Sequence, residues 1–160
     1  MVPYNQMSDK KKHSDKVVPN WIKSEFKKEW ITDKIDNDCI NYVEKLGEFL
    51  CDLNNEKSKN AVTTSQLRNI FGEIKRIETK ASNNEKKWQK ECKQLFLLLR
   101  PKIAYSAARV ISKNNYSRMR GLKEVLDSAH SNVQDLNQFK NFSNFFEGIL
   151  AFHKSYGGKD

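Results

Sequence analysis

Six cationic side chains recur at helical spacing in two stretches of the sequence. They are Arg68, Lys75, Arg76, Lys102, Arg109 and Lys113. Arg68 and Lys75 are seven residues apart and so share one edge of a helix, while Arg76 lies farther round it. The other three fall within about 40° of one another at 100° per residue. A face of this kind can contact the phosphates of a nucleic acid, and it is equally typical of a solvated helix face.

The net charge of the chain is concentrated around these cations. The 160 residues carry a net charge of +9. Residues 65–125 contain 15 Lys and Arg against 5 Glu, whereas residues 29–64 carry 8 acidic residues against 4 Lys. Such a basic block favours an anionic partner. The sequence has no aromatic RNA-binding strand, GxxG loop or zinc knuckle, so binding would use phosphates and sugars and would not read the bases.

The sequence offers no candidate for enzyme catalysis. It contains no P-loop, nucleophile elbow or pair of catalytic carboxylates. His13 lies in the polar N-terminal stretch, His130 on a polar helix face and His153 on an apolar face. None of the three has a cysteine or carboxylate at the spacing of metal ligands. We therefore expect structural histidines, no catalytic residue, no metal and no cofactor.

The cysteines and the apolar runs indicate a cytoplasmic protein. Cys39, Cys51 and Cys92 are odd in number and form no CxxC pair, as is typical of buried free thiols in a reducing compartment. No apolar run approaches the roughly 18 residues of a membrane span, and the N-terminus has no apolar signal segment. We expect no membrane partner.

The apolar residues follow a helical period throughout, and no segment alternates with the period of a strand. Helices are expected over about 35–53, 63–82, 85–99, 102–113, 117–133 and 137–155. Thr63 and Gln66 fit a capping box at the start of the second helix. Pro101 should kink a helix or sit in the first turn of the next one. The predicted fold is all-α, a compact bundle of five or six helices with one kinked or broken at Pro101.

The N-terminal stretch is expected to lie outside this bundle. Residues 1–20 are polar and basic and are predicted to form a disordered tail, while residues 21–160 form a single helical domain. Apolar residues between Trp21 and Ile31 allow one short helix. The acidic face of the first long helix is expected to meet solvent or the basic face of a neighbouring subunit.

Two helices are expected to supply most of the core. Residues 97–99 and 103–108 are apolar or small, which predicts a central helix that other backbones approach closely. The last helix has an apolar arc of about 160°, wider than a one-sided surface helix needs. It is either the buried centre of the bundle, or its Phe145/Phe152 edge faces another subunit.

Three phrases of the sequence resemble motifs of one known family. Residues 63–70 (TTSQLRNI), 100–109 (RPKIAYSAAR) and 144–154 (NFFEGILAFHK) are similar, in order and spacing, to motifs of the small subunit of type III-A CRISPR–Cas (Csm) interference complexes. Two positions depart from the usual pattern, with Ala108 in place of Gly and Gly148 in place of Ala. The similarity is strongest over residues 60–156.

The resemblance implies a small helical bundle without enzymatic activity. Several copies would stack head to tail as the inner filament of a ribonucleoprotein and hold the target RNA paired to the guide RNA. Other Csm subunits, the backbone subunit and the large polymerase-like subunit, would be partners and would carry the nuclease and cyclic-oligoadenylate chemistry. The six cations would then contact the RNA backbone.

An alternative function is that of a helical protein–protein adaptor. In that case Lys102 and Arg109 meet an acidic face such as Glu44 and Glu48 of a neighbouring subunit, and contact with RNA is incidental. Charge reversal of the cations separates the two hypotheses, because it affects RNA capture in one and assembly in the other.

Overall fold

The computed structural model describes residues 17–53, 60–111 and 117–160, and for residues 110 and 111 it describes only the backbone. Lys113 and most of the predicted tail, residues 1–16, lie outside the described residues. The division into a tail and one domain therefore stays a prediction. Among the described residues, Val18 packs against the core.

The described parts of the chain contain helices and no strand, which confirms the all-α prediction. The short helices are α2 (Trp21–Ser24), α3 (Glu29–Thr32) and α6 (Glu85–Lys87), and α6 leads into a π-helical turn, η1 (Trp88–Cys92). The long helices are α4 (Asn37–Cys51), α5 (Thr64–Ala81), α7 (Lys93–Ile111), α8 (Ser117–His130) and α9 (Leu136–Ser155).

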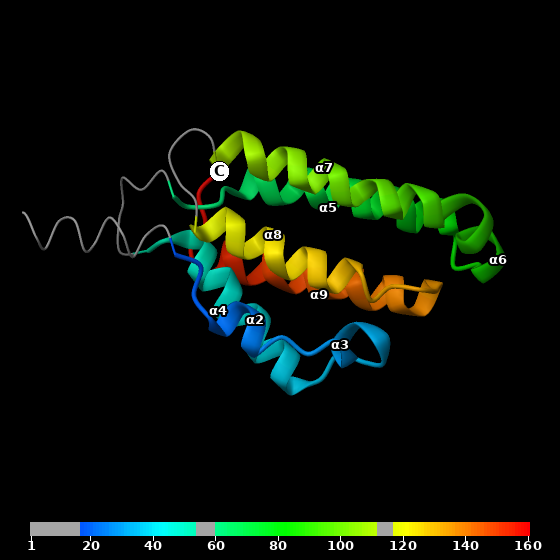
Figure 1. Ribbon diagram of the computed structural model, residues 1–160, viewed down its shortest axis with the longest axis horizontal. Coiled ribbons are helices and arrows are strands. Elements are labelled where there is room, and N and C mark those ends of the chain that lie inside the picture. Colours follow the sequence, from blue (N-terminus) through cyan, green and yellow to red (C-terminus); the bar gives the residue numbers. More distant parts are fainter. Residues whose placement is uncertain (1–16, 54–59, 112–116) are drawn as a thin grey trace, which may run out of the picture.

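The long helices pack in a closed cycle around one core. α5 lies against α7, α7 against α8, α8 against α4, α4 against α9, and α9 against α5. Figure 1 shows α5 and α7 along one long side of the molecule, with α4 and the short helices α2 and α3 on the opposite side. The cycle therefore leaves the outer faces of α5 and α7 on one shared surface.

Helices α4 and α9 pack closely through one glycine from each helix. A Cβ on Gly47 of α4 would lie 2.7 Å from the backbone nitrogen of His153 and 2.8 Å from Cβ of Phe152. In return, a Cβ on Gly148 of α9 would lie 3.0 Å from Cγ2 of Val43. Because both positions lack a side chain, the two backbones can approach closely. This approach brings aromatic side chains of α4 and α9 into contact.

The last helix is the buried centre of the bundle, as the first of the two alternatives predicted. Its core side chains Phe139, Phe142, Phe145, Phe146 and Ile149 are all at most 1% exposed. Phe145 stacks on Tyr42 and meets Phe26 edge-on, with ring centroids 6.1 and 5.8 Å apart. This edge is thus covered by the protein's own N-terminal segments, α2 to α4.

Those N-terminal segments form two short helices where one was expected. Ile22, Trp30 and Ile31 are buried in the same core as the long helices. Tyr42 Oη donates a hydrogen bond of 2.5 Å to the carbonyl of Ile22 and so ties α2 to α4. Burial raises the pKa of Tyr42, and the Glu25 and Cys39 charges raise it further.

Both ends of α5 are set by local hydrogen bonds. The predicted capping box is confirmed, since Gln66 N donates to Thr63 Oγ1 at 3.1 Å and Thr63 N donates to Gln66 Oε1 at 2.8 Å. The C-terminal segment holds the same end, because Thr64 N donates to the carbonyl of Lys159 at 2.6 Å. At the other end Ser82 adopts a left-handed conformation with φ 52°, which ends the helix.

The predicted helices on either side of Pro101 are one continuous helix, so of the two predicted alternatives, a kink or a break, the break does not occur. Pro101 lies inside α7. A proline at this position removes the hydrogen bond to the carbonyl of Leu97. Leu97 and Pro101 both lie on the exposed side of α7, where water can solvate that carbonyl, while α7 is held by its buried side.

The prediction that α7 is a central helix with residues 97–99 in the core is wrong for two of those leucines. Leu97 is 57% exposed and Leu98 is 50% exposed, whereas Leu99 is buried. The buried stripe of this helix is Phe96, Leu99, Ile103 and Ala107, and it continues the line of the buried Cys92 in η1. Its spacing of three or four residues fits one face only, so α7 lies at the edge of the bundle with an apolar outer side.

The three cysteines are free and buried, as predicted. Burial raises the pKa of Cys39 to about 12 and the pKa of Cys51 to about 11. Burial also raises the pKa of Cys92. Since the thiolate is the reactive form, these thiols are chemically inert core residues.

The same glycine-to-alanine change should have opposite effects in α4 and α5. Gly47→Ala inserts a methyl group against the backbone of α9 and should lower the free energy of unfolding by about 1–3 kcal/mol. Gly72 has no atom within 4 Å of the Cβ position and is exposed, so Gly72→Ala should raise it by about 0.5–1 kcal/mol. Urea denaturation of both variants measures the difference. Equal effects of the two changes would contradict the close approach of α4 and α9.

Candidate nucleic-acid interface

The five predicted cations that the structure describes lie on α5 and α7, and these two helices pack against each other. Arg68, Arg76, Lys102 and Arg109 are exposed, and Lys75 is half-buried. We call this surface the α5–α7 face. The packing of the two basic helices, which the spacing alone did not establish, places both helices along one side of the molecule (Figure 1).

One carboxylate joins the cations of the two helices. Glu73 Oε1 forms an ion pair with Nη1 of Arg76 at 3.2 Å, and Glu73 Oε2 forms one with Nζ of Lys102 at 3.3 Å. The Arg76 and Lys102 side chains are 81% and 63% exposed. Because exposed pairs of this kind contribute only about 0–1 kcal/mol, either cation can exchange Glu73 for an anion of a partner at little cost.

The other cations of the α5–α7 face differ in their surroundings. Lys75 Nζ pairs with Glu78 at 2.8 Å and lies 5.1 Å from the centre of the Phe71 ring. Arg68 forms no ion pair within the part of the chain that the structure describes. The Arg109 guanidinium lies over the ring of Tyr105, 5.9 Å from its centroid.

A groove of about 470 Å³ runs between α5 and α7 beside these cations. Its floor is made by Ile70, Leu99 and Ile103, which are nearly fully buried. Its walls carry polar and aromatic groups. They are Asn69 and Glu73 on α5, and Pro101, Lys102, Tyr105 and Ser106 on α7. We call this cavity the α5–α7 groove.

Several other cations of the basic block stabilise the fold instead of facing outward. Arg118 Nη2 pairs with Asp52 Oδ1 at 2.9 Å, with side chains only 18% and 10% exposed, and the guanidinium lies 4.4 Å from the centre of the Phe49 ring. These contacts tie α8 to α4. A cation at a helix N-terminus, as Arg118 is, opposes the helix dipole. The structure shows that Asp52 compensates for this charge.

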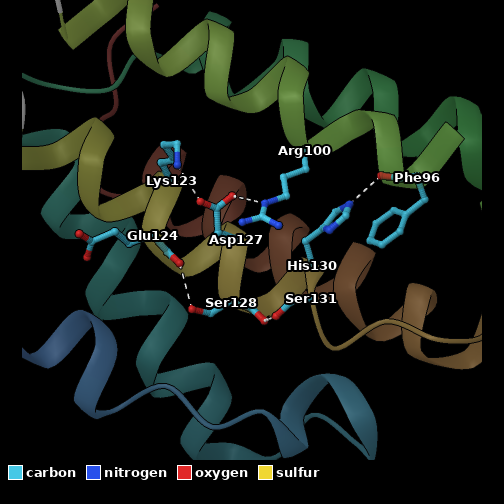
Figure 2. A network of polar contacts seen from close by, with 8 residues as sticks. All are labelled: Phe96, Arg100, Lys123, Glu124, Asp127, Ser128, His130 and Ser131. Atoms are coloured by element: carbon cyan, nitrogen blue, oxygen red, sulfur yellow. Dashed lines mark hydrogen bonds and ion pairs between the residues drawn. The ribbon is translucent and has the colours of Figure 1, made fainter. Parts of the chain in front are cut away.

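A second set of ion pairs, in which the Arg100 side chain is 59% exposed, joins α7 to α8. Figure 2 shows Asp127 between two cations, with Lys123 Nζ at 2.7 Å and Arg100 Nε at 3.6 Å. Arg100 reaches across from α7, while Lys123 comes from the preceding turn of α8. Asp127 thus pairs with both cations at the α7–α8 contact, on the side of α7 that faces away from α5.

His130 lies in the same region and is buried, which corrects its predicted place on a polar face. Its ring stacks on Phe96 with centroids 4.0 Å apart, and Nε2 donates to the Phe96 carbonyl at 2.6 Å (Figure 2). The buried side of α8 includes this turn because α7 packs over it. Burial lowers the pKa of His130, and the charge of Arg100 lowers it further. The hydrogen bond to the Phe96 carbonyl and the charge of Asp127 raise this pKa in part.

His153 is buried on its apolar face, as predicted. Nε2 donates to the carbonyl of Val62 at 2.7 Å, and Nδ1 has no hydrogen-bond partner in the described structure. Burial lowers the pKa of His153. Both described histidines therefore have structural roles at helix contacts.

The described residues contain no cluster of three or more His, Cys, Asp or Glu side chains that could hold a metal ion. None of the helices in the described ranges is long and apolar enough to cross a membrane.

Glu73 is the residue of this surface that the sequence alone did not single out. Its pairing with Arg76 follows from a spacing of three residues on one helix, and that signal was available. Its pairing with Lys102 depends on how α5 and α7 are aligned, which no local pattern reports.

The fold and this surface define an all-α bundle protein with a cationic outer face. A comparison with protein families matches residues 32–159 to the Csm2 Type III-A model. The chain belongs to the Csm2 family of type III-A CRISPR complexes, whose members are small subunits of the complex. Searches among curated proteins and among solved structures found no significant match.

Acidification should destabilise the protein through its buried histidines. The folded-state pKa values of His130 and His153 lie below the usual 6.5, so the unfolded chain binds more protons and stability falls as the pH drops through about 6.5. His130→Gln retains a donor for the Phe96 carbonyl but does not titrate. Its melting temperature should therefore fall less between pH 7.5 and 5.5 than that of the wild type, in a range where most carboxyl groups stay ionised. Identical pH dependence in both proteins would contradict this role of His130.

Proposed function

We propose that the protein is a non-catalytic, cytoplasmic subunit that binds target RNA, or the duplex of guide and target, along its α5–α7 face. In this proposal several copies stack as the inner filament of a type III-A CRISPR ribonucleoprotein in antiviral defence. Their partners are the backbone subunit, the large polymerase-like subunit and further copies of this chain. Membership of the Csm2 family supports a place in that complex.

The observation that carries the proposal is the sorting of the cations. Arg118, Lys123 and Arg100 pair with Asp52 and Asp127 at contacts between helices. The five predicted RNA-binding residues that the structure describes lie instead on α5 and α7. Four of them are exposed and Lys75 is half-buried, and Arg76 and Lys102 share a single carboxylate. The surface thus keeps excess positive charge where a polyanion can reach it.

The expected affinity of one copy is modest. If each subunit neutralises about three phosphates, the logarithm of the binding constant should fall with the logarithm of salt concentration at a slope of about −2 to −3. Stacked copies would raise the overall affinity, because each further contact is made at a high effective concentration. A filament therefore turns a weak, sequence-independent contact into stable capture of a long RNA.

Charge reversal on the α5–α7 face should weaken RNA capture and leave the complex assembled. Arg68→Glu and Arg109→Glu should each reduce the affinity of the assembled complex for target RNA about tenfold or more, because hydrogen bonds to charged groups contribute about 1.5–3 kcal/mol. The salt slope should become less negative by about 1 for each lost phosphate contact. Filter binding at several salt concentrations measures both quantities.

Lys34→Glu is the matched control for these variants. It makes the same change in net charge at an exposed position between α3 and α4, away from the α5–α7 face, and should leave the affinity nearly unchanged. If the two reversals leave RNA affinity unchanged in an intact complex, the proposal is wrong. If they prevent assembly instead, the adaptor hypothesis is correct, in which these cations bind an acidic face of a neighbour.

Removing the charge of Glu73 should have the opposite effect. Glu73→Gln releases Arg76 and Lys102 from their shared carboxylate and removes a negative charge that repels phosphate. RNA affinity should rise several-fold at low salt, and the gain should shrink as salt screens the charges. The same binding assay measures it, with Glu91→Gln, on an exposed part of the chain outside the α5–α7 groove, as the control. A loss of affinity in Glu73→Gln would show that Glu73 positions the cations instead of neutralising them.

A further inference from the structure

Tyr105 is the most exposed large apolar side chain among the described residues, at 67% of its surface. It lies on the outer side of α7 and lines the α5–α7 groove. The ring gives the α5–α7 face an aromatic surface beside the Arg109 guanidinium.

The groove beside Tyr105 has the size and the composition of a small-ligand site. Its volume of about 470 Å³ lies within the range of roughly 300–1,000 Å³ that such sites occupy. Its apolar floor is formed by Ile70, Leu99 and Ile103, so a flat apolar group entering it would cover carbon atoms. Asn69 and Ser106 add hydrogen-bonding groups at its walls.

Two cations lie at the groove, and one of them, Lys102, is paired with the Glu73 carboxylate on the opposite wall. Lys102 lines it with a side chain that is 63% exposed, and Arg109 lies over the Tyr105 ring at 5.9 Å. A flat apolar group with an adjoining negative charge therefore fits both parts of the site. A nucleotide has this combination, because its base is flat and its phosphate is anionic.

We propose that the α5–α7 groove accepts one unpaired nucleobase of an RNA strand, stacked on Tyr105, with the adjoining phosphate bound by Lys102 and Arg109. The base must be unpaired, because pairing and stacking within a duplex cover the faces that an aromatic ring could contact. Stacking on an aromatic side chain tolerates any base, which agrees with the absence of sequence-reading motifs. The inference rests on the proposed function, since it assumes that RNA lies along the α5–α7 face.

The charged groups of the groove favour this occupant over an apolar side chain from another protein. Lys102 pairs with Glu73 at 3.3 Å, and a phosphate can replace that carboxylate, whereas an apolar protein side chain would desolvate both charges and offer them no polar group. The apolar surface suited to a protein partner lies elsewhere on α7, at Leu97 and Leu98, neither of which lines the groove.

The test compares binding of the full chain to two single-stranded RNAs of equal length, one with all its bases and one with abasic sites throughout. Tyr105→Ala should weaken binding of the normal RNA about fivefold or more, from the usual contribution of one stacked base. It should leave binding of the abasic strand and the salt slope unchanged, because no phosphate contact is lost. Tyr105→Phe keeps the ring and should bind as the wild type does.

Leu97→Ala is the control, since it removes exposed apolar surface from the same helix outside the groove. The inference is overturned if Tyr105→Ala binds the normal RNA within twofold of the wild type, or if the wild type binds both RNAs equally. It is also overturned if Tyr105→Ala reduces self-association in sedimentation velocity but not RNA affinity, since the groove then holds protein. In any of these cases the proposed function still stands if Arg68→Glu weakens RNA capture.

Discussion

The contact between α4 and α9 is the constraint on which the rest of the structure depends. Gly47 and Gly148 allow the two backbones to approach, and this approach brings Tyr42 of α4 against Phe145 of α9. The opposite side of α9 packs on α5, and the segment after α9 bonds to the start of α5 through Lys159. The position of the cationic face is therefore fixed by a contact on the far side of the bundle.

The basic block of this chain divides into structural cations and surface cations. Arg118 is mostly buried, stacks on Phe49 and pairs with Asp52, so its removal would take a cationic partner from a mostly buried carboxylate. Arg76 and Lys102 pair with Glu73 at the surface, where such pairs contribute little to stability. Net charge alone cannot make this distinction, because it counts both kinds of cation equally.

Sequence patterns predicted the features that depend on neighbouring residues in the chain. The capping box of Thr63 and Gln66, the buried stripes of most helices and the buried aromatic side of α9 are local or periodic, and the structure confirms them. The exposure of Leu97 and Leu98 and the burial of His130 were not predicted. Each depends on which side of a helix another helix covers, and composition and periodicity do not contain that information.

The candidate site was predictable to the same extent. The cations could be chosen from their spacing, but their meeting across α5 and α7 and their shared partner Glu73 required the packed structure.

An electron cryo-microscopy structure of the assembled complex with bound target RNA tests the central claim most directly. The account predicts phosphates within hydrogen-bonding distance of Arg68 and Lys102 on the α5–α7 face. RNA on another face, or a protein subunit covering α5 and α7, would contradict it.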